Sequence, residues 1–313
     1  MTVEEVPQPE PGPDEVLVDV RAASVNPIDT YVREGNLPPA GGLPHIGGSD
    51  LAGVIEAVGS SVTAFELGDR VFATGLGIFS PGTYAEYTVA PADMLAPLPE
   101  GTPFQDGAAA AMAFATAWRA LVTRGGLTVE DVCLIHGAAG GVGHAAVQIA
   151  AHAGCYVIGT ASEGAPSEFV DSLGANAVVD YRRDDLAAAV QAAANDRTVD
   201  VVLEPHADAN IAADLRTVSR GGRIVLIGED GPIEITPPVS MEGKKADADL
   251  RFMSIVASRD EQAPILRRIG PRLADGTFFT HIDETYPLSE LPVAHERLMD
   301  SGVLGKIVID TSD

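Results

Sequence analysis

The chain has 313 residues, a length typical of two domains, and its 46% hydrophobic and 21% charged residues indicate a folded globular protein. Its net charge of −25, with lysine only at Lys244, Lys245 and Lys306, argues against a nucleic-acid or anionic-membrane partner, because both require a basic surface. No apolar run reaches the length of a membrane span and the N-terminus lacks the regions of a signal peptide, so we expect a cytoplasmic protein.

The first hundred residues alternate short apolar runs with Gly/Pro-rich turns. Residues 15–22 predict the first strand, and Pro27 forces Asn26 into an extended conformation and ends any helix there. Further short strands are predicted within residues 43–59, 68–73 and 82–89. This pattern predicts a small, barrel-like β domain.

From residue 107 the chain becomes alanine-rich and helical, and then strands alternate with helices. Such alternation predicts an α/β fold with a parallel, doubly wound sheet of Rossmann type. The predicted strands are 155–160, 177–180, 199–203, 223–227 and 252–257, and the predicted helices include 168–173, 186–194 and 209–218. Beyond about residue 264 this rhythm stops, and a helix at 291–299 precedes a last strand at 306–309 that is expected to return to the first domain.

The most informative segment is a glycine-rich turn after the apolar run 132–136. Against the G-x-G-x-x-G pattern the first place is Ala138, followed by Gly140 and Gly143, so the strict form lacks one glycine. A close helix–strand crossing alone would also explain such glycines. A strand before, a helix after and a second strand about 20 residues on favour a dinucleotide pyrophosphate site instead. The residues expected to contact the pyrophosphate are Gly140, Gly141, Val142 and Gly143.

The end of the second strand of this unit bears on cofactor choice. NAD enzymes place an acidic residue there for the ribose diol. This chain has Ser162, which can bind a 2′-phosphate without repelling it, although Glu163 follows directly. We therefore expect NADPH, with NADH as the alternative.

Several segments together resemble the medium-chain dehydrogenase/reductase superfamily, and within it the zinc-free quinone oxidoreductases related to zeta-crystallin. The resemblance implies a GroES-like catalytic domain formed by residues 1–118 and 265–313 around a Rossmann domain of residues 119–264. It also implies NADPH as the reductant and a homodimer. The segments that carry it are 24–35, 48–55, 82–87, 116–121, the glycine turn and 286–306.

The resemblance also implies site residues. Asn26 and Tyr31 are expected to line the catalytic cleft; Tyr31 either donates a hydrogen bond to developing negative charge or forms only an aromatic wall, and Asn26 either acts there or merely caps a turn. Thr116 is expected beside the nicotinamide, and Lys306 near the pyrophosphate. The other expected cofactor contacts are Thr160, Ser162, Tyr181, Leu226, Gly228, Val256 and Ser258.

Zinc-dependent members of the superfamily place their catalytic metal ligands at positions that here hold Asn26, Ser49 and Met112, none of them a usual zinc ligand, so we expect no zinc. Hydride transfer without a Lewis acid suits an acceptor such as a quinone. Reduction of activated alkenes (enones or enals) is the enzymatic alternative. Some relatives carry an aromatic residue a few positions after Tyr31, where this chain has Leu37, and this difference bears on the preference for quinones. A structural protein that binds NADPH without catalysis is the non-enzymatic alternative.

Two further expectations concern the surface and the start of the chain. The acidic surface is typical either of an ordinary solvated face or of a halophilic source, where high ionic strength screens self-repulsion. Relatives usually have one more strand before residues 9–12, so we expect either a catalytic domain without that edge strand or a chain that starts late.

Overall fold

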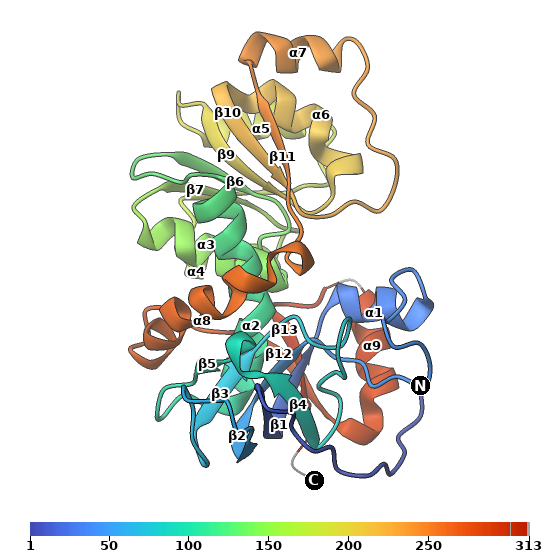
Figure 1. Ribbon diagram of the computed structural model, residues 1–313. Coiled ribbons are helices and arrows are strands. Elements are labelled where there is room, and N and C mark those ends of the chain that lie inside the picture. The colour runs from blue at the N-terminus through green and yellow to red at the C-terminus, as the bar shows by residue number, and fades with distance from the viewer. Residues whose placement is uncertain (301, 312–313) are drawn as a thin grey trace. The chain divides into compact units, whose positions relative to one another are not determined.

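The computed structural model describes residues 1–300 and 302–311, which divide into two compact units. The first unit combines Met1–Ala115 with Ile255–Asp313, and the second is Thr116–Ser254. The chain enters and leaves the second unit once, so the first unit is built from both ends of the sequence (Figure 1).

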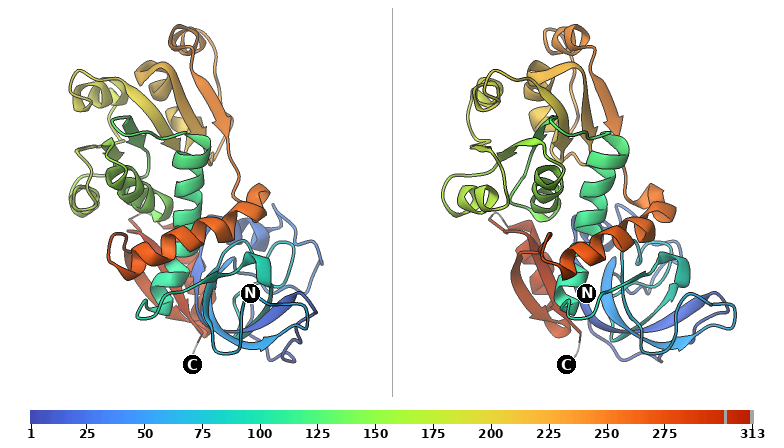
Figure 2. Two further views of the ribbon diagram at one scale, coloured as in Figure 1. Left: turned by 60° about the vertical axis from the view of Figure 1, so that its left-hand side comes forward. Right: turned by 90° about the vertical axis from the view of Figure 1, so that its left-hand side faces the viewer.

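The first unit contains a seven-stranded sheet in which β1 (Glu15–Val25) is central. β1 pairs antiparallel with three strands. One of them bonds to residues 16–24 on one side of β1, and on the other side two different strands bond to residues 15–19 and 22–25. Figure 2 shows the red C-terminal strands beside the blue N-terminal ones. The other strands are β2 (Asp50–Val58), β3 (Arg70–Ala73), β4 (Tyr87–Pro91), β5 (Ala96–Pro97), β12 (Ile282–Pro287) and β13 (Lys306–Asp310).

Helix α1 (Pro27–Glu34) begins where the sequence suggested only a break. Asn26 is extended, with φ −131° and ψ 154°, as a residue before proline should be, and Pro27 then occupies the first helical turn, where its missing N–H costs nothing. The other helices of this unit are α8 (Arg259–Ala274), α9 (Leu291–Met299) and short 3₁₀ turns at Ala92–Met94, Val256–Ser258 and Leu288–Glu290, while α2 (Phe104–Trp118) runs from the first unit into the second.

The second unit is a six-stranded, wholly parallel sheet in the order β11-β10-β9-β6-β7-β8. The predicted doubly wound Rossmann-type sheet is therefore confirmed. Its strands are β6 (Val132–Ile135), β7 (Tyr156–Thr160), β8 (Ala177–Val179), β9 (Val199–Glu204), β10 (Val218–Leu226) and β11 (Asp249–Phe252).

Helices cover both faces of this sheet. Ile158 of β7 packs in one core cluster with α5 (Leu186–Ala193) and α6 (Ala207–Thr217). The next residue, Gly159, faces the opposite way, since successive strand residues alternate, and approaches Val170 of α4 (Ala165–Ser172). The remaining helices of the unit are α3 (Gly141–His152), α7 (Val239–Ala246) and a π-helical turn at Arg119–Arg124.

The strand predicted at 252–257 is wrong. β11 ends at Phe252, which lies opposite Leu226, the last residue of its only strand partner in the described sheet, so no neighbour continues the ladder. The chain turns instead through a 3₁₀ helix, in which the Ser258 hydroxyl donates to the Ile255 carbonyl. α8 then packs on β3 and β5 of the first unit. No helix among the described residues is long and apolar enough to cross a membrane.

Candidate active site

The glycine turn (residues 137–143) lies at the carboxyl edge of the parallel sheet, between β6 and α3. Gly137 has φ +59°, a left-handed conformation that suits glycine. The N–H of Ala138 donates to the carbonyl of Thr160 at 2.9 Å, and the N–H of Gly140 donates to the carbonyl of Gly137 at 3.0 Å. The first of these bonds joins the turn to the end of β7, and the second closes the turn on itself.

Two glycines of the turn have different roles. A Cβ on Gly143 would lie 2.1 Å from the carbonyl oxygen of Gly137, so only glycine permits α3 to start this close to the turn. A Cβ on Gly140 would meet nothing nearer than 3.4 Å, so this side of the turn is open. Helix geometry leaves the first N–H groups of α3 without intrahelical partners. The turn therefore fits a pyrophosphate, whose oxygens those donors suit.

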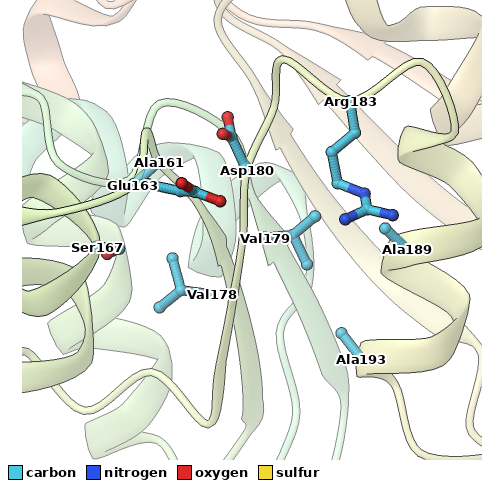
Figure 3. Close-up of a pocket in the computed structure, with 9 residues that line it drawn as sticks. All are labelled: Ala161, Glu163, Ser167, Val178, Val179, Asp180, Arg183, Ala189 and Ala193. Atoms are coloured by element: carbon cyan, nitrogen blue, oxygen red, sulfur yellow. The ribbon is translucent and has the colours of Figure 1, made fainter.

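A cavity of about 360 Å³ adjoins the carboxyl ends of β7 and β8. Its charged lining residues are Glu163, Asp180 and Arg183 (Figure 3). The two carboxylates lie on one side of β8, and the Arg183 guanidinium extends on the other side, toward Ala189. Arg183 pairs with Asp185 at 2.8 Å, on the exposed rim. The cavity therefore presents carboxylates that would repel a phosphate group and a guanidinium that would attract one.

The other predicted cofactor residues of the second unit are spread along the same sheet edge, except Thr116, which lies on α2. Ser162 is half-buried next to the cavity-lining Glu163, and Tyr181 is 51% exposed beyond β8. Gly228 follows β10, where a Cβ would lie 2.7 Å from the carbonyl oxygen of Pro205. The remaining three, Thr116, Thr160 and Leu226, are buried.

In the first unit, Asn26 lies in a buried polar network, called the Asn26 network below. Asn26 Nδ2 donates to Asp50 Oδ2 at 2.9 Å, and Asn26 Oδ1 accepts from Lys306 Nζ at 2.5 Å. The sheet brings these residues together, because β1 ends beside the first residues of β2 and β13. The members of the network are Ser24, Asn26, Asp29, Ser49, Asp50, Tyr84 and Lys306, all buried except the partly buried Tyr84.

Asp29 anchors the other half of the network. Its carboxylate accepts from Ser49 Oγ at 2.6 Å, from Tyr84 OH at 3.0 Å and from the N–H of Asn26 at 2.9 Å. The last bond caps α1, since the residue three positions into a helix reaches back to the cap. Burial, together with the charge of Asp50, raises the pKa of Asp29 to about 6, although these hydrogen bonds oppose the rise.

Lys306 is 4% exposed, and its ammonium also donates to the carbonyl of Val25 at 2.8 Å. Burial lowers the pKa of Lys306, while the charges of Asp50 and Asp29 act against that change. Burial likewise raises the pKa of Asp50, and the charge of Lys306 opposes that rise. One buried cation therefore lies beside two buried carboxyl groups.

The remaining predicted residues of the first unit lie outside the network. Tyr31, on α1, is 43% exposed. Val256 is half-buried and Ser258 is buried, both in the 3₁₀ turn that replaces the predicted strand. The structure therefore brings Asn26 and Lys306 together, while Tyr31 is partly exposed on α1.

Known proteins match this chain along most of its length. Residues 12–100 match the family model of the alcohol dehydrogenase GroES-like domain, and residues 173–309 match that of zinc-binding dehydrogenases. Over 307 residues the chain is 37% identical to the quinone oxidoreductase of Lama guanicoe, covering 97% of this chain and 91% of that protein. The chain belongs to the quinone oxidoreductase branch of the medium-chain dehydrogenase/reductase superfamily. It is accordingly an oxidoreductase of that family, as the sequence resemblance implied.

Solved structures agree with this assignment of the fold. An NAD-dependent alcohol dehydrogenase is 31% identical, with a TM-score of 0.90 over 99% of this chain and 95% of that one. A mycobacterial protein solved in complex with NADPH is 29% identical, with a TM-score of 0.85 over 98% of this chain and 94% of that one. The GroES-like and Rossmann-type architecture expected for a medium-chain dehydrogenase/reductase is confirmed.

The donor groups at the positions of the catalytic metal ligands do not fit a zinc ion. Asn26 Oδ1 already accepts from an ammonium group, which would repel a second cation, and the Ser49 hydroxyl donates to Asp29. Met112, the third position, is a buried thioether. Amide, hydroxyl and thioether groups are not usual ligands of zinc in proteins.

Sequence reasoning missed three functional candidates of this oxidoreductase: Asp29, Asp50 and Tyr84. A signal existed for Asp29, since Asn26-Pro27-x-Asp29 is a plausible helix start with an acidic residue in its first turn. For Asp50 and Tyr84 no local pattern marks a buried polar residue, because their partners come from other strands and loops.

Proposed function

We propose that this protein is an NADPH-dependent quinone reductase that transfers hydride without zinc. The observation that carries the proposal is the glycine turn, closed by Gly143 and open at Gly140, in a chain that aligns from end to end with a quinone oxidoreductase. The second unit is proposed to bind the nucleotide. The first unit is proposed to contribute the residues that contact the acceptor.

The nucleotide supplies the hydride when it is bound, so the chain has to bind and orient it. Gly140, Gly141, Val142 and Gly143 are proposed to hold the pyrophosphate through the N–H groups at the start of α3. The nucleotide contacts beyond the turn are proposed to be Thr116, Thr160, Ser162, Tyr181, Leu226, Gly228, Val256 and Ser258.

Asn26 and Tyr31 are the proposed catalytic residues. The amide of Asn26 has a fixed orientation, since Lys306 donates to its oxygen and its nitrogen donates to Asp50. Tyr31 is exposed enough to reach a ligand and is proposed to donate a hydrogen bond to the acceptor oxygen as negative charge develops there. Lys306, proposed from sequence to offset pyrophosphate charge, would also act through Asn26, because its ammonium is committed to that residue.

NADPH is proposed over NADH because Ser162 replaces the acidic residue typical of NAD enzymes and Arg183 lines the adjacent cavity. A structurally similar mycobacterial protein has been solved with NADPH. Glu163, which lines the same cavity, and the similar NAD-dependent alcohol dehydrogenase favour NADH as the alternative.

Independence from zinc is proposed from the donor groups of this chain. The ammonium of Lys306 lies within 2.5 Å of Asn26 Oδ1, at one of the three positions that zinc-dependent relatives use for metal ligands. A quinone takes up hydride without a Lewis acid, since its reduction yields an aromatic hydroquinone.

Reduction of an activated alkene is the second candidate reaction. The observation that keeps it open is Leu37, which stands where some relatives carry an aromatic residue. Its N–H donates to the carbonyl of Tyr31 at 3.1 Å, so the backbone of the loop after α1 joins this position to the proposed catalytic tyrosine.

The proposal is tested by following NADPH consumption by the purified protein with a panel of benzoquinones, naphthoquinones, enones and enals, after dialysis against a chelator. We expect turnover with quinones that dialysis leaves unchanged. Faster turnover with enones than with any quinone would favour alkene reduction. Tight NADPH binding without turnover on any acceptor would indicate a nucleotide-binding structural protein.

A homodimer is also proposed. β11 is an edge strand of the six-stranded sheet and carries the exposed Phe252, and edge strands readily pair with a second chain. Light scattering of the purified protein at several concentrations tests this, with a mass of twice 32.4 kDa as the expected result.

A further inference from the structure

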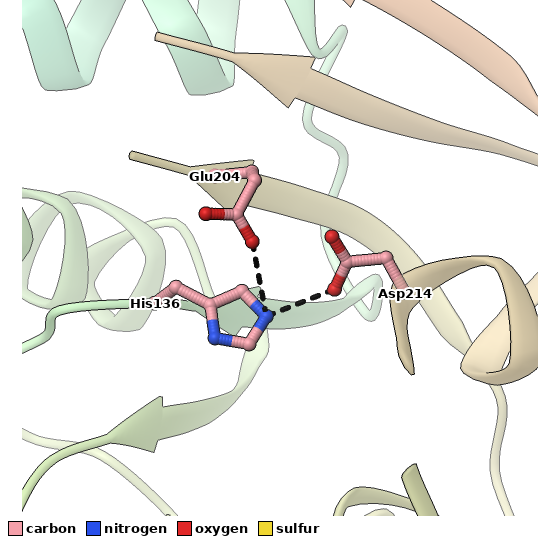
Figure 4. A group of neighbouring side chains, drawn as sticks. All are labelled: His136, Glu204 and Asp214. Carbon is pink, nitrogen blue, oxygen red and sulfur yellow. Dashed lines mark hydrogen bonds and ion pairs between the residues drawn. The ribbon is translucent and has the colours of Figure 1, made fainter. Parts of the chain in front are cut away.

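A buried cluster of titratable side chains in the second unit has no role in the reaction proposed above. His136 directly follows β6, Glu204 ends β9, and Asp214 lies on α6. All three are buried, and one ligand atom from each lies within 4.8 Å of the others (Figure 4). The parallel pairing of β6 with β9 places His136 beside Glu204, because Ile135 and Leu203 are opposite one another.

The imidazole of His136 connects this cluster to the glycine turn. Its Nε2 lies 2.9 Å from Asp214 Oδ1 and 3.5 Å from Glu204 Oε2. On the other side of the ring, Nδ1 lies 3.2 Å from Thr160 Oγ1. That same hydroxyl oxygen accepts from the N–H of Gly137 at 3.2 Å. A single hydroxyl group thus bonds both the cluster and the first residue of the turn.

Two carboxyl groups in a buried space require compensation of their charge. Glu204 Oε2 and Asp214 Oδ2 are buried and accept no hydrogen bond from the described residues, and a proton on Glu204 would let its carboxyl group donate to Asp214. Burial, together with the charge of Asp214, raises the pKa of Glu204 to about 8, although the charge of His136 opposes this. Burial acts to lower the pKa of His136, but the charge and hydrogen bond of Asp214 and the charge of Glu204 outweigh it and raise the pKa.

When Glu204 is protonated, the positive charge of the His136 imidazolium and the negative charge of the Asp214 carboxylate cancel, so the cluster has no net charge. Asp214 and Glu204 are the titratable side chains that act on the imidazole. Glu204 Oε1 accepts from Asn210 Nδ2 at 3.3 Å and from the backbone N–H of His206, so α6 holds the carboxyl group in place. All polar groups of the cluster then have partners.

We propose that His136 is a positioning residue for the nucleotide. Held by Asp214 and a protonated Glu204, it donates to the hydroxyl of Thr160 and fixes that oxygen where it also accepts from Gly137, which sets the conformation of the glycine turn. This inference rests on the proposed nucleotide site, and it adds a second effect: binding should depend on one buried proton that the hydride transfer itself does not use.

The first experiment compares Thr160→Val with Thr160→Ser. Valine keeps the shape of threonine but removes the acceptor of both hydrogen bonds, whereas serine keeps it. We expect the Kd for NADPH to rise about tenfold in Thr160→Val and less than about twofold in Thr160→Ser. Faster hydrogen exchange of the Gly137 amide in Thr160→Val alone would show that the turn, and not a direct ligand contact, has changed.

The second experiment follows the Kd for NADPH and for NADH from pH 7 to pH 9. Loss of the Glu204 proton places a second negative charge in the cluster, so we expect wild-type affinity to fall about tenfold over this range. Glu204→Gln keeps a donor toward Asp214 and an acceptor for Asn210 at every pH. Its affinity should therefore stay within about twofold over the same range.

Distinct results would overturn the inference. Equal nucleotide affinity in Thr160→Val and Thr160→Ser, or the same pH dependence in wild type and Glu204→Gln, would remove the positioning role and leave the proposed function standing. A wild-type protein that binds neither NADPH nor NADH would overturn both. A stoichiometric divalent cation retained by wild type and lost in Asp214→Asn would show that a metal ion, and not a proton, joins the two carboxylates.

Discussion

Lys306 Nζ donates a hydrogen bond of 2.5 Å to Oδ1 of Asn26, although the two residues are 280 positions apart in the chain. The pair joins the first residue of β13 to the residue that follows β1, at the point where the two ends of the sequence share one sheet. Because Asp50 lies 4.0 Å from the same ammonium, the pair also balances a buried carboxylate.

Replacing Lys306 should therefore destabilise the first unit. Lys306→Met leaves Asp50 as a buried charge and removes the donor to Asn26, so we expect a loss of about 3 kcal/mol or more in the free energy of unfolding. The matched control is Lys245→Met, at an exposed lysine that pairs with Glu242, where the loss should stay below about 0.5 kcal/mol. Urea unfolding measures both. Equal, small losses would show that the buried ammonium contributes nothing.

Asp29 should make stability depend on pH in a defined window. Its pKa is raised to about 6 in the folded protein, mainly by burial, so between about pH 4 and pH 6 the folded state holds more protons than the unfolded state. Stability from this group is consequently present below pH 4 and is lost as the pH rises through 6. The loss amounts to about 3 kcal/mol at neutral pH.

The test compares wild type with Asp29→Asn, which cannot ionise, by urea unfolding from pH 4 to pH 7. We expect the difference in unfolding free energy between the two proteins to shift in favour of the variant as the pH rises. Glu56→Gln, the same replacement at an exposed position, should follow the wild-type curve. Parallel curves for wild type and Asp29→Asn would contradict the raised pKa.

The two glycines of the turn should respond differently to alanine. Gly143→Ala places a Cβ 2.1 Å from the carbonyl oxygen of Gly137, so we expect a loss of about 2 kcal/mol in stability together with loss of NADPH binding. Gly140→Ala has room for its Cβ and should lose less than about 1 kcal/mol while still weakening NADPH binding, because the methyl group enters the proposed pyrophosphate space. Thermal unfolding and fluorescence titration separate the two effects.

Cofactor preference should depend on two charged residues that line the cavity near Ser162. Glu163→Gln removes a carboxylate and should raise the ratio of kcat/KM for NADPH to that for NADH about fivefold, whereas Arg183→Gln should lower it about fivefold. Arg268→Gln, at an exposed arginine of α8 in the first unit, is the control and should leave the ratio unchanged. Ratios that do not respond would place the 2′-phosphate elsewhere.

The net charge of −25 should make stability depend on salt. If the acidic surface is an adaptation to high ionic strength, screening of its self-repulsion should raise the urea midpoint steadily from low to molar KCl. A protein that is more stable without salt would contradict the halophilic hypothesis. An unchanged midpoint would identify the surface as an ordinary solvated one.

Local patterns predicted much of the second unit. The alternation of apolar runs with helical segments predicted five of its strands and the parallel sheet, because strand and helix periodicity are properties of neighbouring residues. The strand at 252–257 failed for a tertiary reason, since β10 ends opposite Phe252 and no strand among the described residues continues the ladder. α1 was missed because a proline that ends one helix also starts another.

The polar sites were harder to predict. Lys306 was interpreted from sequence as a group for phosphate charge, since lysine is rarely buried. Its position beside Asn26 and Asp50 depends on a sheet that joins residues near both ends of the chain. His136 and Asp214 lie 78 positions apart and are unremarkable in their local sequence.

The glycine turn, the parallel sheet around it and the family that the chain resembles could all be read from the residues alone, because each depends on spacing over short distances or on similarity along the whole chain. Which charged groups are buried together became known from the folded structure. Burial and long-range pairing set the protonation of Asp29, Glu204 and Lys306, and neither can be read from the residues adjacent to them.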